Sequence, residues 1–240
     1  MEHSNSALVT QLTRTKAFIF DMDGTLVNLE SLNVSIFSDV LSRNVHLILT
    51  NADYQTYISG SGSLLGLRRL LEAYGKGITH AEALQKEYRT LKLKLLSTQF
   101  HTYVTPTPGA IELISSLRKR GALLALTTST IQEYTQIILK NLNLDRLFHC
   151  VITAENITSP KPHPEAYLTT LSKLGVTSQE SLVFEDSVNG IASARAAHIF
   201  CVGILNQGLN DEFISEADAI IDDFTEVLTL IDPKNKDPVV

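Results

Sequence analysis

Two acidic side chains come directly after an apolar run near the start of the sequence. Asp21 and Asp23 follow residues 17–20, and Gly24 comes next, where a chain leaving a strand can turn sharply. A carboxylate can attack phosphorus and form an acyl-phosphate, and a second carboxyl beside it can protonate the leaving oxygen and later deprotonate water. The pair therefore suits phosphoryl transfer, although an Asp-rich turn at a strand end has the same composition.

A hydroxyl-rich segment is the second candidate. Thr127 and Thr128 end another apolar run, and a capping box from Thr130 to Glu133 predicts that a helix begins there. Hydroxyls and free amides at a helix N-terminus can bind phosphate. We assign Thr127 to the phosphate, with Thr128 beside it; ordinary helix capping is the alternative.

Lys161 and the pair Glu185-Asp186 complete the set. Prolines on both sides restrict the backbone of Lys161, and a lysine held in this way can neutralise a phosphoryl group. Its alternative is a solvated lysine in a surface turn. Glu185 and Asp186 follow a further apolar run, and paired carboxylates suit Mg²⁺, which prefers oxygen ligands. An exposed acidic turn would have the same composition, but all four segments follow expected strands, and this favours the chemical interpretation.

Apolar runs alternate with helical patterns over most of the chain, which predicts an α/β fold. Amphipathic helical patterns separate strands that we expect at 16–20, 122–127, 149–153, 181–184, 199–203 and 218–221. Such alternation indicates βαβ units in a parallel sheet flanked by helices. The carboxyl ends of the strands then share one edge, where ligands bind in open α/β sheets.

One interval departs from this alternation. About a hundred residues separate the first expected strand from the second, too many for a single crossover helix. Residues 29–105 have helical patterns throughout, with apolar stripes that begin at Leu32, Leu67 and Ala81. We predict a core made of residues 1–28 and 106–240, with an all-helical insert at 29–105.

Composition excludes several classes of protein. The 240 residues are 44% hydrophobic with a formal net charge of −6, which fits a folded globular protein and argues against nucleic-acid or anionic-membrane partners. Residues 1–15 lack the pattern of a secretion signal, so we expect a cytoplasmic location. Cys150 and Cys201 lie in apolar stretches and are interpreted as buried reduced thiols. The sequence leaves monomer and dimer equally open.

The order and spacing of these residues resemble the four motifs of the haloacid dehalogenase superfamily. The resemblance rests on the segment Asp21-Met22-Asp23-Gly24-Thr25-Leu26-Val27, followed by Thr127, Lys161 and Glu185-Asp186, and it spans almost the whole chain. It implies a Rossmann-like core with a helical C1 cap at the position of the insert. The most similar branch contains phosphoglycolate phosphatase, sugar-phosphate phosphatases and β-phosphoglucomutase.

The resemblance also implies a role for each motif residue. Asp21 would be the nucleophile that forms an aspartyl-phosphate, and Asp23 the general acid and base. Thr127 and Lys161 would bind the transferring phosphoryl group. Mg²⁺ would be held by a set of acidic groups: Asp21, the backbone carbonyl of Asp23, Asp186 and, through a water, Glu185.

We therefore predict Mg²⁺-dependent hydrolysis of a small phosphorylated metabolite, a phosphomonoester of the sugar-phosphate or phosphoglycolate type. A phosphosugar mutase similar to β-phosphoglucomutase is the alternative. The histidine that such mutases carry in the first cap helix falls at Asn33, and the loop 57–63 offers no basic residue before Arg68. Both departures disfavour the mutase. Candidate substrate contacts in the cap are Tyr57, Ser61, Ser63 and Arg68, with hinges expected near 27–29 and 105–109.

Three other functional interpretations fit the sequence less well. Members of the superfamily that remove halogens lack a carboxylate at the position of Asp23. Members that cleave phosphonates need a Schiff-base lysine early in the cap, and the first lysine of this insert is Lys76. A binding module without turnover would have lost a catalytic carboxylate, and this sequence retains all of them.

Overall fold

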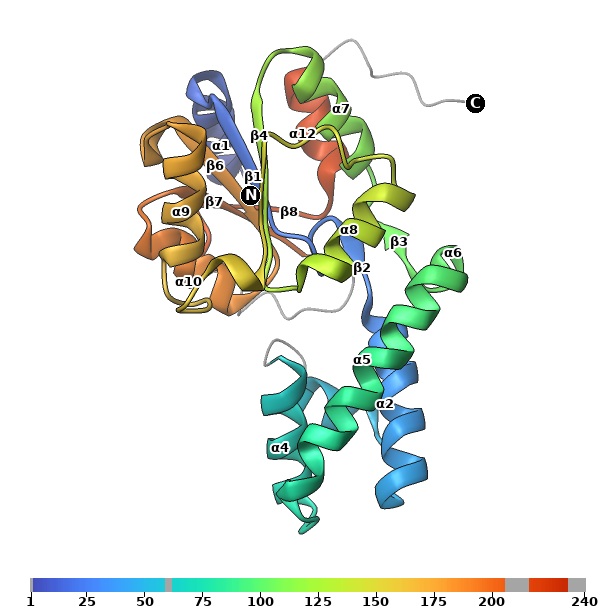
Figure 1. The fold of residues 1–240 in the computed structure, drawn as a ribbon. Helices are drawn as coiled ribbons and strands as arrows, with labels where there is room; N and C mark the ends of the chain where they lie inside the picture. The colour runs from blue at the N-terminus through green and yellow to red at the C-terminus, as the bar shows by residue number, and fades with distance from the viewer. Residues whose placement is uncertain (1, 59–61, 206–215, 233–240) are drawn as a thin grey trace. The chain divides into compact units, whose positions relative to one another are not determined.

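The computed structural model describes residues 2–58, 62–205 and 216–232 (Figure 1). The chain divides into two compact units, one made of Met1–Asn28 and Thr105–Val240 and the other of Leu29–Val104. Across the described ranges, no helix combines the length and the apolar composition needed to cross a membrane.

The first unit contains a six-stranded parallel sheet. Its strands, in spatial order, are β5 (Cys150–Ile152), β4 (Leu123–Thr127), β1 (Ala17–Phe20), β6 (Ser181–Glu185), β7 (Phe200–Ile204) and β8 (Ala219–Ile221). All six predicted strands are confirmed, with bounds that differ from the expected ones by no more than one residue. The strand order reverses beside β1, and such a reversal marks the ligand-binding crevice of open α/β sheets.

Helices cover both faces of this sheet. Helices α9 and α10 pack on one face, and α7 and α12 lie on the other (Figure 1). The helices of this unit are α1 (Glu2–Arg14), α7 (Ala110–Lys119), α8 (Gln132–Asn141), α9 (Glu165–Leu174), α10 (Val188–Ala196) and α12 (Phe224–Ile231), with short 3₁₀ helices η3 (Ala154–Asn156) and η4 (Ser178–Glu180).

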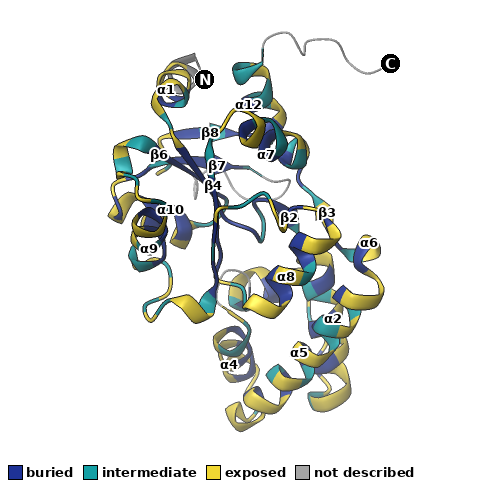
Figure 2. Cartoon of the chain, turned by 45° about the horizontal axis from the view of Figure 1, so that its top comes forward, coloured by how far each residue is buried: buried dark blue, intermediate teal, exposed yellow. Residues whose placement is uncertain are grey.

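The strands are buried on both faces, as Figure 2 shows, and each face has its own apolar cluster. Side chains alternate along a strand, so Ile19 faces the α9 and α10 side while Phe20 faces the other. Phe20 stacks on Phe184 with ring centroids 5.0 Å apart, and both rings contact Phe224 of α12. This two-sided packing explains why the strands are continuous apolar runs.

Helix α1 precedes the first strand and is not among the predicted elements. Its Leu8 is buried, and the Gln11 amide donates to the Ser181 carbonyl of β6 at 3.1 Å. The buried Cys150 and Cys201 are free thiols, which agrees with the expectation from the sequence.

The chain leaves and re-enters the first unit through a short antiparallel pair. Strand β2 (Val27–Asn28) pairs with β3 (Thr105–Pro106), with Val27 opposite Pro106. The Thr107 hydroxyl donates to the Thr25 carbonyl at 2.6 Å, which fixes the returning chain beside the departing one. An insertion here adds residues without interrupting the six-stranded sheet.

The second unit is helical. It consists of α2 (Glu30–Val45), α3 (Asn51–Asp53), the π-helix η1 (Tyr54–Ile58), α4 (Ser63–Ala73), the 3₁₀ helix η2 (Ile78–His80), α5 (Ala81–Thr98) and α6 (Phe100–Tyr103). Phe37 of α2 stacks on Tyr88 of α5 with ring centroids 4.2 Å apart. The leucine stripes of α2 and α4 are buried within it, which accounts for their helical spacing.

Candidate active site

Asp21 follows β1 at the centre of the sheet, beside the ends of two neighbouring strands. Phe20 is in register with Leu126 of β4 and Phe184 of β6, and the Asp21 amide donates to the Phe184 carbonyl at 3.0 Å. Because parallel strands end at the same edge, the residues after β1 and at the ends of β4 and β6 meet there. This edge is the one predicted from the sequence.

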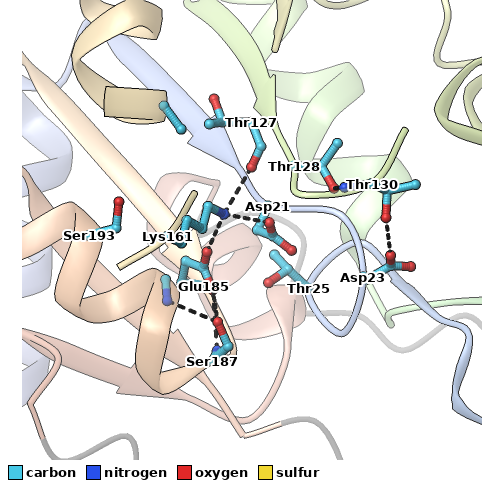
Figure 3. Close-up of polar contacts among 12 residues, drawn as sticks. Asp21, Asp23, Thr25, Thr127, Thr128, Thr130, Lys161, Glu185, Ser187 and Ser193 are labelled. Atoms are coloured by element: carbon cyan, nitrogen blue, oxygen red, sulfur yellow. Dashed lines mark hydrogen bonds and ion pairs between the residues drawn. The ribbon is translucent and has the colours of Figure 1, made fainter. Parts of the chain in front are cut away.

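Lys161 lies among carboxylates at this edge (Figure 3). Its Nζ is 2.7 Å from Asp21 Oδ1 and 2.6 Å from Glu185 Oε1, and it donates to the Thr127 carbonyl at 3.1 Å. These three acceptors match the three donors of an ammonium group. The Lys161 side chain is only 6% exposed. It is therefore a buried counter-charge and not the solvated lysine of a surface turn.

Both carboxylate oxygens of Glu185 are used within the protein. Oε1 accepts hydrogen bonds from Lys161 and from the Tyr167 hydroxyl at 2.8 Å. Oε2 accepts from the backbone amide of Asp186 at 3.1 Å and from the amide and hydroxyl of Ser187. Glu185 thus fixes the position of Lys161, whose Nζ also lies 4.9 Å from the centre of the Tyr167 ring.

Asp21, Glu185 and Asp186 form a cluster that could hold a metal ion. One carboxylate oxygen from each lies within 4.8 Å of the others. The Thr25 hydroxyl donates to Asp186 Oδ1 at 2.9 Å, and a Cβ at Gly24 would lie 1.9 Å from Asp186 Oδ2. Gly24, at φ +87°, therefore provides the turn and also the room for this carboxylate. Such an all-oxygen donor set fits Mg²⁺.

Burial and mutual repulsion oppose full ionisation of this cluster. Burial, together with repulsion from Glu185 and Asp23, raises the pKa of Asp21 to about 7, although Lys161 acts in the opposite direction. Burial, with repulsion from Glu185 and Asp21, also raises the pKa of Asp186 well above its ordinary value. A divalent cation would supply positive charge that the cluster lacks, and would favour the ionised carboxylates.

The charge on Lys161 is favoured by its neighbours. Burial by itself would lower the pKa of Lys161, but the carboxylates of Asp21 and Glu185 outweigh it and raise that pKa above its ordinary value. Lys161 is therefore a permanent cation at the edge of the sheet, as neutralisation of a phosphoryl group requires.

The side chain of Asp23 points to a different group of residues (Figure 3). The Thr130 hydroxyl, in the loop after β4, donates to Asp23 Oδ2. Asp23 Oδ1 is buried and has no hydrogen-bond partner in the described part of the chain. The structure therefore separates the Asp23 carboxyl, bonded to Thr130, from the Asp21 carboxyl, bonded to Lys161.

The two threonines at the end of β4 face different surroundings. The Thr127 side chain is fully buried, and its hydroxyl shares a 2.7 Å hydrogen bond with that of Thr170 in α9. Only the Thr127 carbonyl reaches Lys161. The Thr128 hydroxyl accepts from the Thr130 amide at 3.1 Å, and its own proton has no acceptor among the residues that the structure describes. This geometry does not support the assignment of Thr127 to the phosphate and favours Thr128.

The predicted capping box of α8 is wrong. The helix begins at Gln132 with Ile131 as its N-cap, and that residue makes no side-chain cap. The Gln132 amide donates instead to both carboxylate oxygens of Glu155 at 3.0 Å. Thr130 lies one residue before the cap, and its hydroxyl bonds Asp23.

The candidate contacts of the helical unit are partly occupied within that unit. The Arg68 guanidinium pairs with Glu82, and the Ser63 hydroxyl accepts from Gln85 at 3.0 Å. Tyr57 is half-buried. Ser61 lies outside the described residues. At the mutase histidine position, the Asn33 side-chain carbonyl accepts from the Tyr88 hydroxyl at 2.8 Å.

Comparison with known proteins agrees with this arrangement. The haloacid dehalogenase-like hydrolase family matches residues 18–204, which include every strand-end residue described above. The chain belongs to this family. The match therefore covers the segments between the motifs as well as the motifs themselves.

Two curated relatives of this enzyme are phosphatases. Validoxylamine A 7'-phosphate phosphatase of Streptomyces hygroscopicus subsp. limoneus is 30% identical over 213 residues, which are 88% of this chain and 95% of that protein. Hexitol phosphatase A of Escherichia coli (strain K12) is 28% identical over 227 residues, 95% of this chain and 99% of that protein. The family and these relatives identify a phosphoric monoester hydrolase.

A solved β-phosphoglucomutase has the same fold. The crystal structure from Clostridium difficile superposes with a TM-score of 0.73 at 21% identity, covering 90% of this chain and 96% of that chain. The fold is therefore common to phosphatases and mutases, and individual residues must distinguish them.

Proposed function

We propose that this enzyme hydrolyses a small phosphomonoester, of the sugar-phosphate or phosphoglycolate type, through an aspartyl-phosphate on Asp21 and with Mg²⁺ as cofactor. The single observation that carries the proposal is the buried ion group at the end of β1, in which Lys161 contacts both Asp21 and Glu185. A nucleophilic carboxylate, a permanent cation and further metal-binding carboxylates are the groups that phosphoryl transfer needs.

The residues present fit a magnesium ion. Asp21, Asp186 and the backbone carbonyl of Asp23 would hold it, while Glu185, whose oxygens already accept hydrogen bonds from the protein, would support it through a water. When bound, Mg²⁺ screens the repulsion between Asp21 and an anionic substrate and stabilises charge on the phosphoryl oxygens.

The protein groups then act in two steps. A carboxylate oxygen of Asp21 attacks phosphorus, the bond from phosphorus to the ester oxygen breaks, and Asp23 gives its proton to the departing alkoxide. Asp23 next takes a proton from water, which attacks phosphorus and breaks the bond to Asp21. Phosphate leaves, and both carboxyl groups return to their starting protonation states.

Lys161 and the end of β4 would hold the transferring group. Lys161 supplies a fixed positive charge beside Asp21 Oδ1, and the Thr128 hydroxyl, which accepts from the Thr130 amide, would donate its proton to a phosphoryl oxygen. We further propose that the helical unit acts as a cap that selects the leaving group. The paired strands β2 and β3, through which both of its connections pass, are the natural hinge.

The mutase alternative lacks its distinguishing residues. Asn33 occupies the place of the mutase histidine and bonds Tyr88, and Arg68, the first arginine after the early cap loop, pairs with Glu82. Neither is a free basic group for a second phosphate. Hydrolysis is therefore the favoured outcome.

The proposal is tested by a phosphate-release screen with Mg²⁺ over sugar phosphates, phosphoglycolate and nucleotides, beside an assay of glucose 1-phosphate isomerisation. We expect release from at least one class of small phosphomonoester, no isomerisation, and no release by Asp21→Asn. Isomerisation without net release would favour the mutase. Substantial turnover by Asp21→Asn would exclude Asp21 as the nucleophile.

A further inference from the structure

The two carboxylate oxygens of Asp23 have unequal surroundings. Oδ2 accepts a hydrogen bond from the Thr130 hydroxyl. Oδ1 is buried yet accepts no hydrogen bond from any residue that the structure describes. A buried carboxyl oxygen without a partner is unfavourable because it has lost its water and gained no hydrogen bond, so a position of this kind indicates a ligand that supplies the missing contact.

The backbone around Asp23 is fixed by a compact turn. The amides of Leu26 and Val27 both donate to the Met22 carbonyl, at 2.9 and 3.1 Å, and the Gly24 amide donates to the Val27 carbonyl at 2.8 Å. These contacts hold the Asp23 Cα but leave its side chain free to rotate. Thr130 provides the side-chain contact that selects one orientation.

Thr130 is itself held at both of its backbone groups. Its amide donates to the Thr128 hydroxyl at 3.1 Å, and its carbonyl accepts from the Ala154 amide at 3.1 Å. The residue that contacts Asp23 therefore belongs to the same rigid turn as Thr128, the favoured phosphate ligand. The loop after β4 thus carries both the favoured phosphate ligand and the residue that contacts Asp23.

We infer that Thr130 is a positioning residue that holds Oδ2 of Asp23 and thereby presents Oδ1 to the reacting oxygen. The inference rests on the proposed function and specifies how Asp23, its general acid and base, is oriented. The proton that reaches the leaving oxygen, and later the proton taken from water, would both pass through Oδ1. Without the Thr130 hydroxyl, the Asp23 side chain would sample other rotamers and transfer protons less often.

The test uses two substrates that differ in their need for an acid. p-Nitrophenyl phosphate expels a stabilised phenolate and needs little protonation, whereas a simple alkyl phosphate such as glycerol phosphate expels an alkoxide and needs it strongly. The ratio kcat/KM reports the first phosphoryl transfer, including departure of the leaving group. It is measured for wild type, Thr130→Val, which removes the hydroxyl at nearly constant shape, and Thr130→Ser, which keeps it.

We expect Thr130→Val to lower kcat/KM for the alkyl phosphate by about 10²-fold, as a misplaced catalytic group does. For the nitrophenyl ester, the same variant should lower kcat/KM by no more than about tenfold. Thr130→Ser should retain most of the alkyl phosphate rate. Equal losses with the two substrates, an unchanged alkyl rate in Thr130→Val, or equal damage in both variants would overturn the inference.

The wild-type enzyme separates this inference from the proposed function. If wild type releases phosphate from no phosphomonoester of the screen described above, or if Asp21→Asn matches wild type on a substrate that wild type hydrolyses, the proposed function fails. If wild type hydrolyses both esters through Asp21 and Thr130→Val behaves like wild type, only the positioning role of Thr130 fails.

Discussion

Lys161 is the residue on which the charge balance of the site depends. It is the partner of two buried carboxylates, Asp21 and Glu185, at 2.7 and 2.6 Å. Removing one member of a buried ion pair leaves the other charges without compensation in a medium that solvates them poorly. Stability and chemistry are therefore linked at this single side chain.

Replacement of Lys161 by methionine should lower the free energy of unfolding by about 3 kcal/mol and abolish turnover. Urea unfolding at mildly alkaline pH measures the first effect. The matched control is Lys16→Met, because Lys16 forms a 2.6 Å pair with Glu180 but is 67% exposed. The control should stay within about 1 kcal/mol of wild type. If the two variants unfold at the same urea concentration, the buried ion pair does not stabilise the fold as described.

At the end of β4, the sequence pattern and the structure point to different threonines as the phosphate ligand. The pattern points to Thr127, and the structure points to the next residue, Thr128. Successive side chains of a strand point to opposite faces, so a shift of one position exchanges an interior hydroxyl for one at the ligand edge. The Thr127 hydroxyl shares a hydrogen bond with Thr170 in the interior, whereas the Thr128 hydroxyl follows the strand and, among the described residues, has no acceptor for its proton.

These neighbouring threonines form a matched pair for mutation. Thr128→Val should lower kcat/KM on the order of 10²-fold, because it removes a donor to the phosphoryl group. Thr127→Val should instead lower the free energy of unfolding by about 1 kcal/mol, since it breaks the contact with Thr170, and have the smaller effect on kcat/KM. Phosphate-release kinetics and urea unfolding of both variants measure this. A larger loss of kcat/KM in Thr127→Val than in Thr128→Val would instead identify Thr127 as the phosphate ligand.

The strands of the core and the order of the site residues could be predicted from the sequence, because parallel strands are apolar runs and their ends share an edge. Three positioning contacts could not be predicted. Tyr167 occupies an apolar helical stripe, and its hydroxyl contact to Glu185 depends on how α9 packs. Thr130 lies where the sequence pattern predicts a helix cap, and nothing in that pattern indicates its hydrogen bond to Asp23. Thr25 lies within the first motif, but the motif does not indicate its hydrogen bond to Asp186. Contacts between distant segments of the chain leave no local pattern.

At the scale of the whole molecule, the helical unit is an insertion joined to the core by two connections. Its connections are paired as β2 and β3, so the core sheet is complete without it. The same core carries three acidic side chains close together, and their repulsion affects the stability of the entire fold.

The burial of these carboxylates, together with their mutual repulsion, predicts a pH-dependent effect of Mg²⁺. Asp21 has its pKa raised from 3.8 to about 7, so the folded protein without metal holds a proton that the unfolded chain releases. The stability from that proton is fully present below about pH 4 and is lost progressively as the pH rises from about 4 to about 7; the raised pKa of Asp186 adds in the same direction. The Tm without metal should therefore fall between about pH 4 and 7.

Mg²⁺ binds the ionised form and should raise the Tm more at the upper end of that range. Saturation at about a hundred times the dissociation constant would add roughly 2.7 kcal/mol. Thermal unfolding with Mg²⁺ and with a chelator, at several pH values, measures the shift. Asp186→Asn should reduce it. A magnesium shift that is the same at every pH, or is unaffected by Asp186→Asn, would contradict the proposed metal site.

The most direct measurement for the central claim is chemical identification of the phosphorylated residue. Asp23→Asn should slow attack by water, typically by about 10²–10⁴-fold, while p-nitrophenyl phosphate still transfers its phosphoryl group without an acid. Acid quenching, digestion and mass spectrometry of this variant, with the Asp21→Asn/Asp23→Asn double variant as control, locate the phosphoryl group. We predict that it accumulates on Asp21 and is absent from the double variant. Phosphate release with no phosphorylated Asp21, or a phosphoryl group on another residue, would contradict the account.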